Sequence, residues 1–301
     1  MPKQNTATNK KIDTASYKGV RDFYPEDMVA QNYIFGVWRK VAEEFKYQEY
    51  SASILEYAEL YRSKGSEEIV NEQMYLFKDK GDREVALRPE MTPSLARMIA
   101  ARRKGLKLPL RWYSIPNCFR YERPQRGRRR EHWQLNCDIM GVAGIEAEVE
   151  IISIAYKTMK AFGAQDADFS IRISSRKALP EGTNMETVRK IDRGEEVDIR
   201  IEENEEIKTL IKRLKESGIN NAEFDPKIAR GFDYYTGVVF EVFDTNPENR
   251  RALFGGGRYD NLLEMFGVEP LPTVGFGMGD VTIRDFLKSH NLLKINTNDR
   301  V

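Results

Sequence analysis

The sequence contains few of the side chains that bind metals most often. Its two cysteines, Cys118 and Cys137, are too few for a disulfide framework or a cysteine-rich zinc site. His132 and His290 are the only histidines, so a histidine-based metal site is not expected either. We therefore predict no metal site built from protein side chains, and we expect any catalysis to depend on arginine, carboxylate and tyrosine groups.

The 301-residue chain also lacks long apolar runs and an excess of charge of one sign. Lys and Arg total 48 and Asp and Glu total 47, a net charge of +1, so a site for phosphate or nucleic acid has to be local. No stretch is long enough to span a membrane, and residues 1–16 lack the apolar centre of a secretion signal. We predict a cytoplasmic globular protein in which residues 1–16 form a flexible segment.

Hydrophobic periodicity predicts helices and strands that do not alternate regularly. Apolar residues fall on one helical face at 25–45 and at 145–162, and Thr92-Pro93 predicts the start of another helix, which ends near residue 103. Residues 74–87 predict a β-hairpin in which Gly81 provides the positive φ angle of the turn.

Further elements are expected on both sides of a change in composition. Residues 178–222 are rich in Glu, Lys and Arg and poor in aromatics, so they are predicted to form a short insertion in a domain made of 17–177 and 223–301. The remaining expectations are two strands within 110–141, strands at 168–174, 234–243 and 273–279, a turn at the sequence GGGRYDN, and a last helix from about Asp280. This order favours an α+β fold with a mainly antiparallel sheet.

The segment 119–138 holds six arginines between Arg120 and Arg130, with strand-like sequence at both ends. Guanidinium groups bind phosphate oxygens in pairs and stack on flat bases, so this loop suits a nucleoside triphosphate or an RNA end. The alternative is a solvated basic loop.

Three other stretches carry candidate binding groups. Arg230 precedes Tyr234 and Tyr235 at the start of an apolar strand, where it either binds an anion or faces water. Glycines at 255–257 and at alternate positions of 273–279 let the backbone approach a ligand, and the second set can form a flat floor for a planar ring. In the sequence LRPEMT, Glu90 could bind an ammonium group or simply lie near a helix start.

Taken together and in this order, these stretches resemble histidyl-tRNA synthetase, a class II aminoacyl-tRNA synthetase. The resemblance extends from about Tyr17 to Leu287 and rests on the sequences KGVRDFYPEDM, LRPEMT, FRYERPQRGRRRE, ARGFDYYTGVVFE, GGGRYDNL and the glycine-rich strand. It implies a six-stranded antiparallel sheet flanked by helices, and a homodimer. The implied activity is the activation of histidine by ATP with Mg²⁺ and the transfer of the histidyl group to tRNA(His), if the tRNA can dock.

The resemblance also implies a role for individual residues. Arg120 and Arg230 would be catalytic, because both would bind the α-phosphate and the histidine carboxylate where negative charge builds up. The implied ATP-binding residues are Arg120, Glu122, Arg128, Gly277, Gly279 and Arg284. The implied histidine-binding residues are Glu90, Thr92, Gln134, Asp138, Arg230, Tyr234, Tyr235, Arg258 and Tyr259.

Several positions depart from the family pattern. The family commonly has Glu where this chain has Asp138, and proline near Ser53. An arginine is expected at Thr282, whereas this chain has Arg284 two positions later. We also expect the chain to end before a C-terminal anticodon-binding domain, which needs on the order of 100 residues.

Two alternatives remain open. A related core without that domain serves as the histidine-sensing regulatory subunit of ATP phosphoribosyltransferase. An RNA-binding module without catalysis would explain the arginine-rich segment but not the glycine-rich strand.

Overall fold

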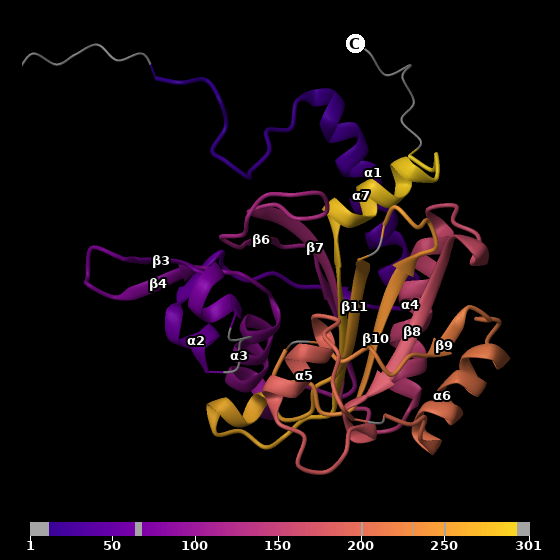
Figure 1. Ribbon diagram of the computed structural model, residues 1–301. Coiled ribbons are helices and arrows are strands. Elements are labelled where there is room, and N and C mark those ends of the chain that lie inside the picture. The colour runs from indigo at the N-terminus through magenta and orange to yellow at the C-terminus, as the bar shows by residue number, and fades with distance from the viewer. Residues whose placement is uncertain (1–11, 64–67, 200, 231, 250, 294–301) are drawn as a thin grey trace, which may run out of the picture.

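A mixed β-sheet forms the centre of the protein in this computed structural model, which describes residues 12–63, 68–199, 201–230, 232–249 and 251–293 (Figure 1). Its strands lie in the order β1 (Gln48–Glu49), β5 (Leu110–Ser114), β7 (Glu131–Met140), β12 (Thr273–Gly279), β11 (Ala252–Arg258), β10 (Val238–Asp244), β8 (Phe169–Ser175) and β9 (Ala222–Phe224), and β6 (Asn117–Phe119) pairs with β7. Only β1–β5 and β8–β9 are parallel within the described residues. The predicted α+β fold with a mainly antiparallel sheet is confirmed, although the sheet exceeds the six strands that the resemblance implied.

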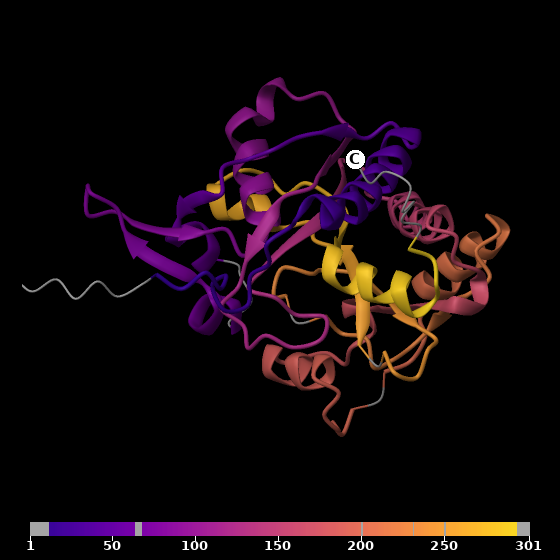
Figure 2. The ribbon, with the colours of Figure 1, turned by 90° about the horizontal axis from the view of Figure 1, so that it is seen from above.

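Helices cover one face of this sheet. They are α1 (Pro25–Glu44), α4 (Glu146–Ala161) and α7 (Asp280–Ser289), and α6 (Glu205–Glu216) packs against α4 near the edge strand β9 (Figures 1 and 2). The first turns of α1 and α4 carry acidic side chains, which the helix dipole stabilises there. The helices predicted from apolar periodicity at 25–45 and 145–162 are present as α1 and α4. No helix in the described ranges has both the length and the apolarity needed to cross a bilayer.

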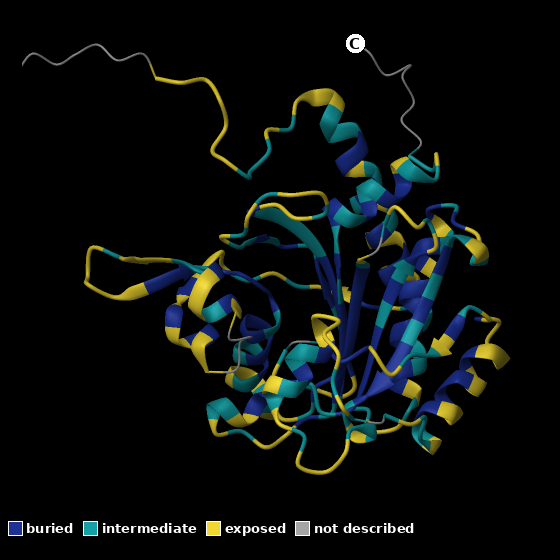
Figure 3. Ribbon diagram, viewed as in Figure 1, coloured by how far each residue is buried: buried dark blue, intermediate teal, exposed yellow. Residues whose placement is uncertain are grey.

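The main core lies between these helices and the sheet. Figure 3 shows the central strands as largely buried, because one face packs on helices while residues of α3 pack against Leu110 and Met140 on the other. A further short helix, α5 (Met185–Asp192), contributes Val188 and Ile191 to a small separate apolar cluster. Trp38, Phe162 and Phe240 are among the largest fully buried side chains of this layer. Ile207, Leu210 and Leu214 of α6 belong to the same core, so the second half of the 178–222 segment packs on the sheet.

A second, smaller layer protrudes from the body. It combines α2 (Ala58–Arg62), α3 (Thr92–Arg102) and the three-stranded sheet β2 (Leu55–Tyr57), β4 (Glu84–Leu87) and β3 (Tyr75–Lys78), and its β3–β4 hairpin extends away from the rest (Figures 1 and 2). The hairpin was predicted correctly, but Asp82, not Gly81, has the positive φ angle, at 59°. Aspartate tolerates this conformation better than most residues. The short helical turns are Ile69–Gln73, Arg103–Gly105, Asp166–Asp168, Arg176–Ala178 and Leu262–Phe266.

The glycine-rich sequence at 255–257 forms the middle of strand β11, so the turn predicted there is wrong. Glycine has low strand propensity, and the sequence by itself therefore favours a turn. Pairing with β10 and β12 on both sides imposes the extended conformation. In the neighbouring strand the predicted start at 234 is also early, since β10 begins at Val238.

Replacing Gly256 with Ala is expected to destabilise the protein by about 1–3 kcal/mol. A Cβ at Gly256 would lie 2.1 Å from the carbonyl oxygen of Gly275 on the paired strand, and that backbone cannot move aside without breaking the sheet. Gly36→Ala is the matched control, because nothing lies within 4 Å of its Cβ position and alanine favours a helix. Urea unfolding should show Gly36→Ala equal to or more stable than the parent; a stable Gly256→Ala would contradict the packing described here.

Candidate active site

A cavity lined by charged side chains lies on the sheet face away from the main core. Gln134, Asn136 and Asp138 alternate along β7, so all three point to this face. Residues from β7, β11, β12, the arginine-rich hairpin, the LRPEMT segment and the Arg230 segment line the cavity, namely Glu90, Thr92, Arg120, Gln134, Asn136, Asp138, Arg230, Phe232, Tyr234, Tyr235, Gly255, Tyr259, Gly275, Phe276 and Gly277.

Glycines form the floor of this cavity and leave room for its polar groups. A Cβ at Gly275 would lie 2.0 Å from Oδ1 of Asp138, and one at Gly277 would lie 1.6 Å from Nε2 of Gln134. A Cβ at Gly255 would lie 2.9 Å from a guanidinium nitrogen of Arg230. The side chains above the sheet therefore use space that a Cβ at these three positions would occupy.

Two guanidinium groups that are far apart in the sequence reach the same cavity. The Nε of Arg120 donates to the carbonyl oxygen of Pro89 at 2.9 Å, and Nη1 of Arg230 donates to Oε1 of Glu241 at 2.8 Å. The positive charges of both arginines act on Glu90, whose pKa they lower against the effect of burial. The structure thus brings together the two residues predicted to be catalytic.

Glu90 is a buried carboxylate, 4% exposed, that is only partly compensated. The Tyr234 hydroxyl donates to its Oε2 at 3.1 Å, while Oε1 is buried without a hydrogen-bond partner among the described residues. Burial raises the pKa of Glu90 to about 7, and Arg120, Tyr234 and Arg230 oppose this shift. A cation bound here would satisfy the open oxygen and restore the charged form.

Asp138 forms the second carboxylate of the cavity. The Tyr259 hydroxyl donates to its Oδ1, and burial raises the pKa of Asp138 to about 7 in spite of this hydrogen bond. An ionised carboxylate beside a phenol can accept a hydrogen bond from an N–H group of a flat ring. The two carboxylates and the two guanidinium groups give the cavity binding groups of both negative and positive charge.

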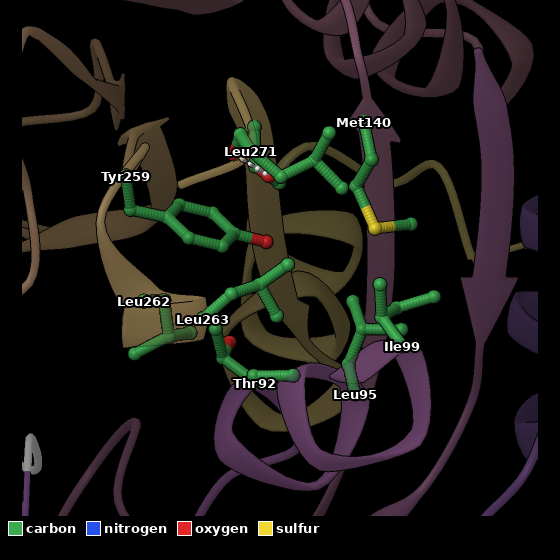
Figure 4. A pocket seen from close by; sticks show the side chains of 10 residues that line it. Thr92, Leu95, Ile99, Met140, Tyr259, Leu262, Leu263 and Leu271 are labelled. Atoms are coloured by element: carbon green, nitrogen blue, oxygen red, sulfur yellow. Dashed lines mark hydrogen bonds between the residues drawn. The ribbon is translucent and has the colours of Figure 1, made fainter. Parts of the chain in front are cut away.

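An apolar cavity adjoins this site and shares Thr92 and Tyr259 with it. Figure 4 shows the Tyr259 ring beside the aliphatic side chains of α3, β7 and the turn at 262–266. The other labelled residues are Leu95, Ile99, Met140, Leu262, Leu263 and Leu271. These apolar contacts hold the ring in a position from which its hydroxyl reaches Asp138.

Five of the predicted site residues do not line the cavity. Arg258 points to the opposite face of the sheet, where its Nε and Nη2 donate to Glu148 at 2.6 and 2.7 Å, so its predicted place near the histidine ring is wrong. The Arg258 side chain alternates with Gly257 and Tyr259 along β11, and this register turns it into the protein.

Arg284 also lies away from the cavity. Its Nη2 donates to the carbonyl oxygen of Asp27 at 3.1 Å, and its guanidinium lies over Phe23, so it does not replace the arginine expected at Thr282. The Thr282 hydroxyl instead donates to the carbonyl of Leu253 at 2.6 Å. The helix starts where the sequence predicted, and Arg284 is therefore on its far side.

The remaining three are Glu122, Arg128 and Gly279. Glu122 and Arg128 form an ion pair at 3.6 Å in the arginine-rich hairpin, and Gly279 is the residue before α7.

Among the cavity residues, five were not predicted, and most had a visible signal. Asn136 lies between Gln134 and Asp138 in a period of two, and Gly255 and Gly275 belong to glycine-rich stretches that were singled out. Phe232 and Phe276 had no such signal, since aromatic residues in strand-like sequence are usually part of a core.

The chain is similar to known proteins over most of its length. The histidyl-tRNA synthetase family model matches residues 19–177 and 175–281. A histidine–tRNA ligase of Leptospira biflexa is 44% identical over 94% of this chain and 76% of its own length. A chloroplastic/mitochondrial histidine–tRNA ligase of Arabidopsis thaliana is 38% identical over 95% of this chain and 68% of its own.

Solved structures show the same fold. Apo histidyl-tRNA synthetase of S. aureus has a TM-score of 0.73 at 24% identity, covering 94% of this chain and 72% of that one. A Bacillus halodurans protein titled ATP phosphoribosyltransferase regulatory subunit/histidyl-tRNA synthetase has a TM-score of 0.76 at 22% identity, covering 93% and 84%.

The mixed, mainly antiparallel sheet with its flanking helices has the fold of a class II aminoacyl-tRNA synthetase. Within that class, the chain belongs to the histidyl-tRNA synthetase family and is an aminoacyl-tRNA ligase of the histidine–tRNA ligase type. The alignment to the Leptospira relative spans 333 positions, more than the 301 residues of this chain, so the relative has residues within the matched region that this chain lacks.

Replacing Asp138 with Asn is expected to stabilise the free protein at pH 8 while weakening its binding of histidine. Because burial raises the pKa of Asp138, the folded state binds a proton more tightly than the unfolded chain, and stability falls as the pH rises from about 4 to about 7. Asparagine removes this penalty, which is on the order of 4 kcal/mol above pH 7.

Thermal unfolding at pH 5 and pH 8 checks the first part, and calorimetric titration with histidine checks the second. The gain in Tm should be larger at pH 8 than at pH 5, where the wild-type carboxyl is already mostly protonated. An equal gain at both pH values would contradict the raised pKa.

Proposed function

We propose that Arg120 and Arg230 catalyse the first half of the ligase reaction. A carboxylate oxygen of histidine attacks the α-phosphorus of ATP, the bond to the bridging oxygen of pyrophosphate breaks, and histidyl-adenylate forms. Negative charge builds up on the α-phosphoryl oxygens during this step, where preorganised guanidinium groups stabilise it most. The observation that carries the proposal is the convergence of both guanidinium groups on one cavity, next to Glu90.

The two carboxylates of the cavity would orient histidine at opposite ends. Glu90, whose Oε1 has no partner among the described residues, would bind the α-ammonium group together with Thr92 and Gln134. Asp138 and Tyr259 would hold the imidazole ring, with Tyr234 and Tyr235 as further walls. A ring without an N–H group would leave Asp138 buried and unpaired, and this cost would select for histidine.

ATP would lie over the glycine floor beside the arginine-rich hairpin. Gly277 lines the cavity, and the hairpin residues Glu122 and Arg128 would exchange their ion pair for contacts with the nucleotide. The described residues contain no cluster of three or more metal-ligating side chains. Mg²⁺ would therefore enter with ATP, bound to phosphate oxygens, and neutralise charge on the leaving pyrophosphate.

The ligase is favoured over a non-catalytic histidine sensor. A sensor would need the carboxylates that bind histidine but would not need two arginines directed at a reacting phosphate. The Leptospira ligase is 44% identical to this chain, whereas the structure with the regulatory-subunit title is 22% identical and supports only the fold.

Arg230→Ala is expected to reduce histidine-dependent exchange of labelled pyrophosphate into ATP by roughly 100-fold or more, because it removes charge stabilisation from the transition state. Histidine affinity, measured by calorimetry, should change much less. Arg213→Ala is the control, since Arg213 forms an exposed ion pair with Glu146 at 2.9 Å outside the cavity. Wild-type protein that binds histidine but shows no exchange at any histidine concentration would overturn the ligase proposal and favour the sensor.

A second copy of the chain would cover an exposed apolar face on the small three-stranded sheet. Tyr57 and Phe77 both lie opposite Val85 in the sheet, so their side chains share one face with Leu55, two residues before Tyr57. Tyr57 is 58% exposed, Phe77 46% and Leu55 43%. Contiguous exposed aromatic and aliphatic groups are typical of interfaces between proteins.

The double variant Tyr57→Ser/Phe77→Ser is therefore expected to be monomeric at concentrations at which the wild type sediments as a dimer. Tyr24→Ser serves as the control, because Tyr24 is 64% exposed and lies at the start of α1, away from this sheet. Analytical ultracentrifugation distinguishes the two. A double variant that remains dimeric would place the interface elsewhere.

A further inference from the structure

Arg230 has a backbone conformation that needs support from its surroundings. Its φ angle is 55°, in the left-handed region that residues with a Cβ seldom occupy. Of the described non-glycine residues with positive φ, which are Lys46, Asp82, Arg230 and Asn291, only Arg230 lines the cavity. Such a conformation persists only where neighbouring groups impose it.

The side chain of Arg176 contacts the backbone at this position. Its Nη2 donates to the carbonyl oxygen of Arg230 at 2.5 Å and to that of Phe232 at 3.1 Å. Both acceptors belong to the segment that carries the proposed catalytic guanidinium. One guanidinium nitrogen therefore fixes two carbonyl groups and, with them, the direction in which the Arg230 side chain leaves the backbone.

The backbone of Arg176 is itself anchored at the other end of this segment. Its N–H donates to the carbonyl oxygen of Gly237 at 2.9 Å, directly before strand β10 begins. Ser175 pairs with Val238 across the sheet, and its hydroxyl accepts a hydrogen bond from the N–H of Lys177 at 3.2 Å. Arg176 thus contacts both the Arg230 end and the Gly237 end of the segment and is held rigidly by the sheet.

We propose that Arg176 is a positioning residue that holds Arg230 in the orientation required for histidine activation. Arg176 does not line the cavity, so it would act through Arg230 and not on the substrates. A planar guanidinium donates to several carbonyl groups in fixed directions, whereas a lysine ammonium provides a flexible point charge. The inference rests on the role proposed above for Arg230, and the experiment below separates the two.

Arg176→Met is expected to reduce kcat of pyrophosphate exchange by roughly 10- to 100-fold, because a misplacement of about 1 Å at the reacting centre costs that much. The dissociation constant of histidine should stay within about threefold, since Glu90 and Asp138 remain in place. Arg176→Lys should recover part of the lost activity, because it keeps one donor within reach. Melting temperatures verify that each variant is folded. If Arg176→Met does not fold, the same kinetic comparison is made with Arg176→Lys.

Arg172→Met is the matched control. Arg172 lies on β8, the strand that ends directly before Arg176. It forms an ion pair with Asp225 at 3.2 Å and stacks on the Phe243 ring, but contacts neither Arg230 nor Phe232 in the hydrogen bonds of the described residues. Its loss should leave kcat within about twofold of the wild type, as expected for a surface arginine outside the site.

A double variant decides whether Arg176 acts through Arg230. If it does, Arg230→Ala/Arg176→Met should be no slower than Arg230→Ala, because the positioned group is already absent. If the losses in kcat of the two single variants multiply in the double variant, the inference is overturned and the role of Arg230 stays intact. The same holds if Arg176→Met is as active as the control. An Arg230→Ala enzyme with wild-type exchange would instead overturn the proposed function itself.

Discussion

The pocket depends on a steric constraint in the middle of the sheet. Strands β11 and β12 carry glycine where their side chains would point into the cavity, and at Gly275 and Gly277 a Cβ would overlap Asp138 and Gln134. Glycines weaken a strand, but pairing on both sides keeps these two extended. The same absence of side chains gives a flat surface above which the Arg230 guanidinium and a carboxylate lie together.

Electrostatics in this space are arranged at a cost to stability. Burial raises the pKa of both Glu90 and Asp138 to about 7, so the free protein carries two carboxyl groups that are only partly ionised near neutral pH. In the complex proposed above, histidine would offer an ammonium group to Glu90 and an N–H group to Asp138. Unfavourable burial in the free protein would thereby become selective binding in the complex, as is common for sites that trade stability for function.

The expectations that were wrong failed for physical reasons. The glycines at 255–257 were expected in a turn because glycine has low strand propensity, yet hydrogen bonds from two neighbouring strands decided their conformation. Arg258 was expected beside the histidine ring, but strand register turns every second side chain to the other face. Arg284 was expected to contact ATP, but the phase of helix α7 placed its guanidinium beside the start of α1. For the glycines and Arg258, strands distant in the sequence made the difference, whereas for Arg284 it was the phase of its own helix.

By itself the sequence determined the class of fold, most helices, and the majority of the cavity residues, because local periodicity and the order of motifs are properties of consecutive residues. Ten of the predicted positions, Glu90, Thr92, Arg120, Gln134, Asp138, Arg230, Tyr234, Tyr235, Tyr259 and Gly277, line the cavity. Only the tertiary structure decided the register of β11, the raised pKa values and the contact of Arg176 with the backbone of Arg230. These depend on burial and on pairings between segments far apart in the chain, which no local pattern encodes.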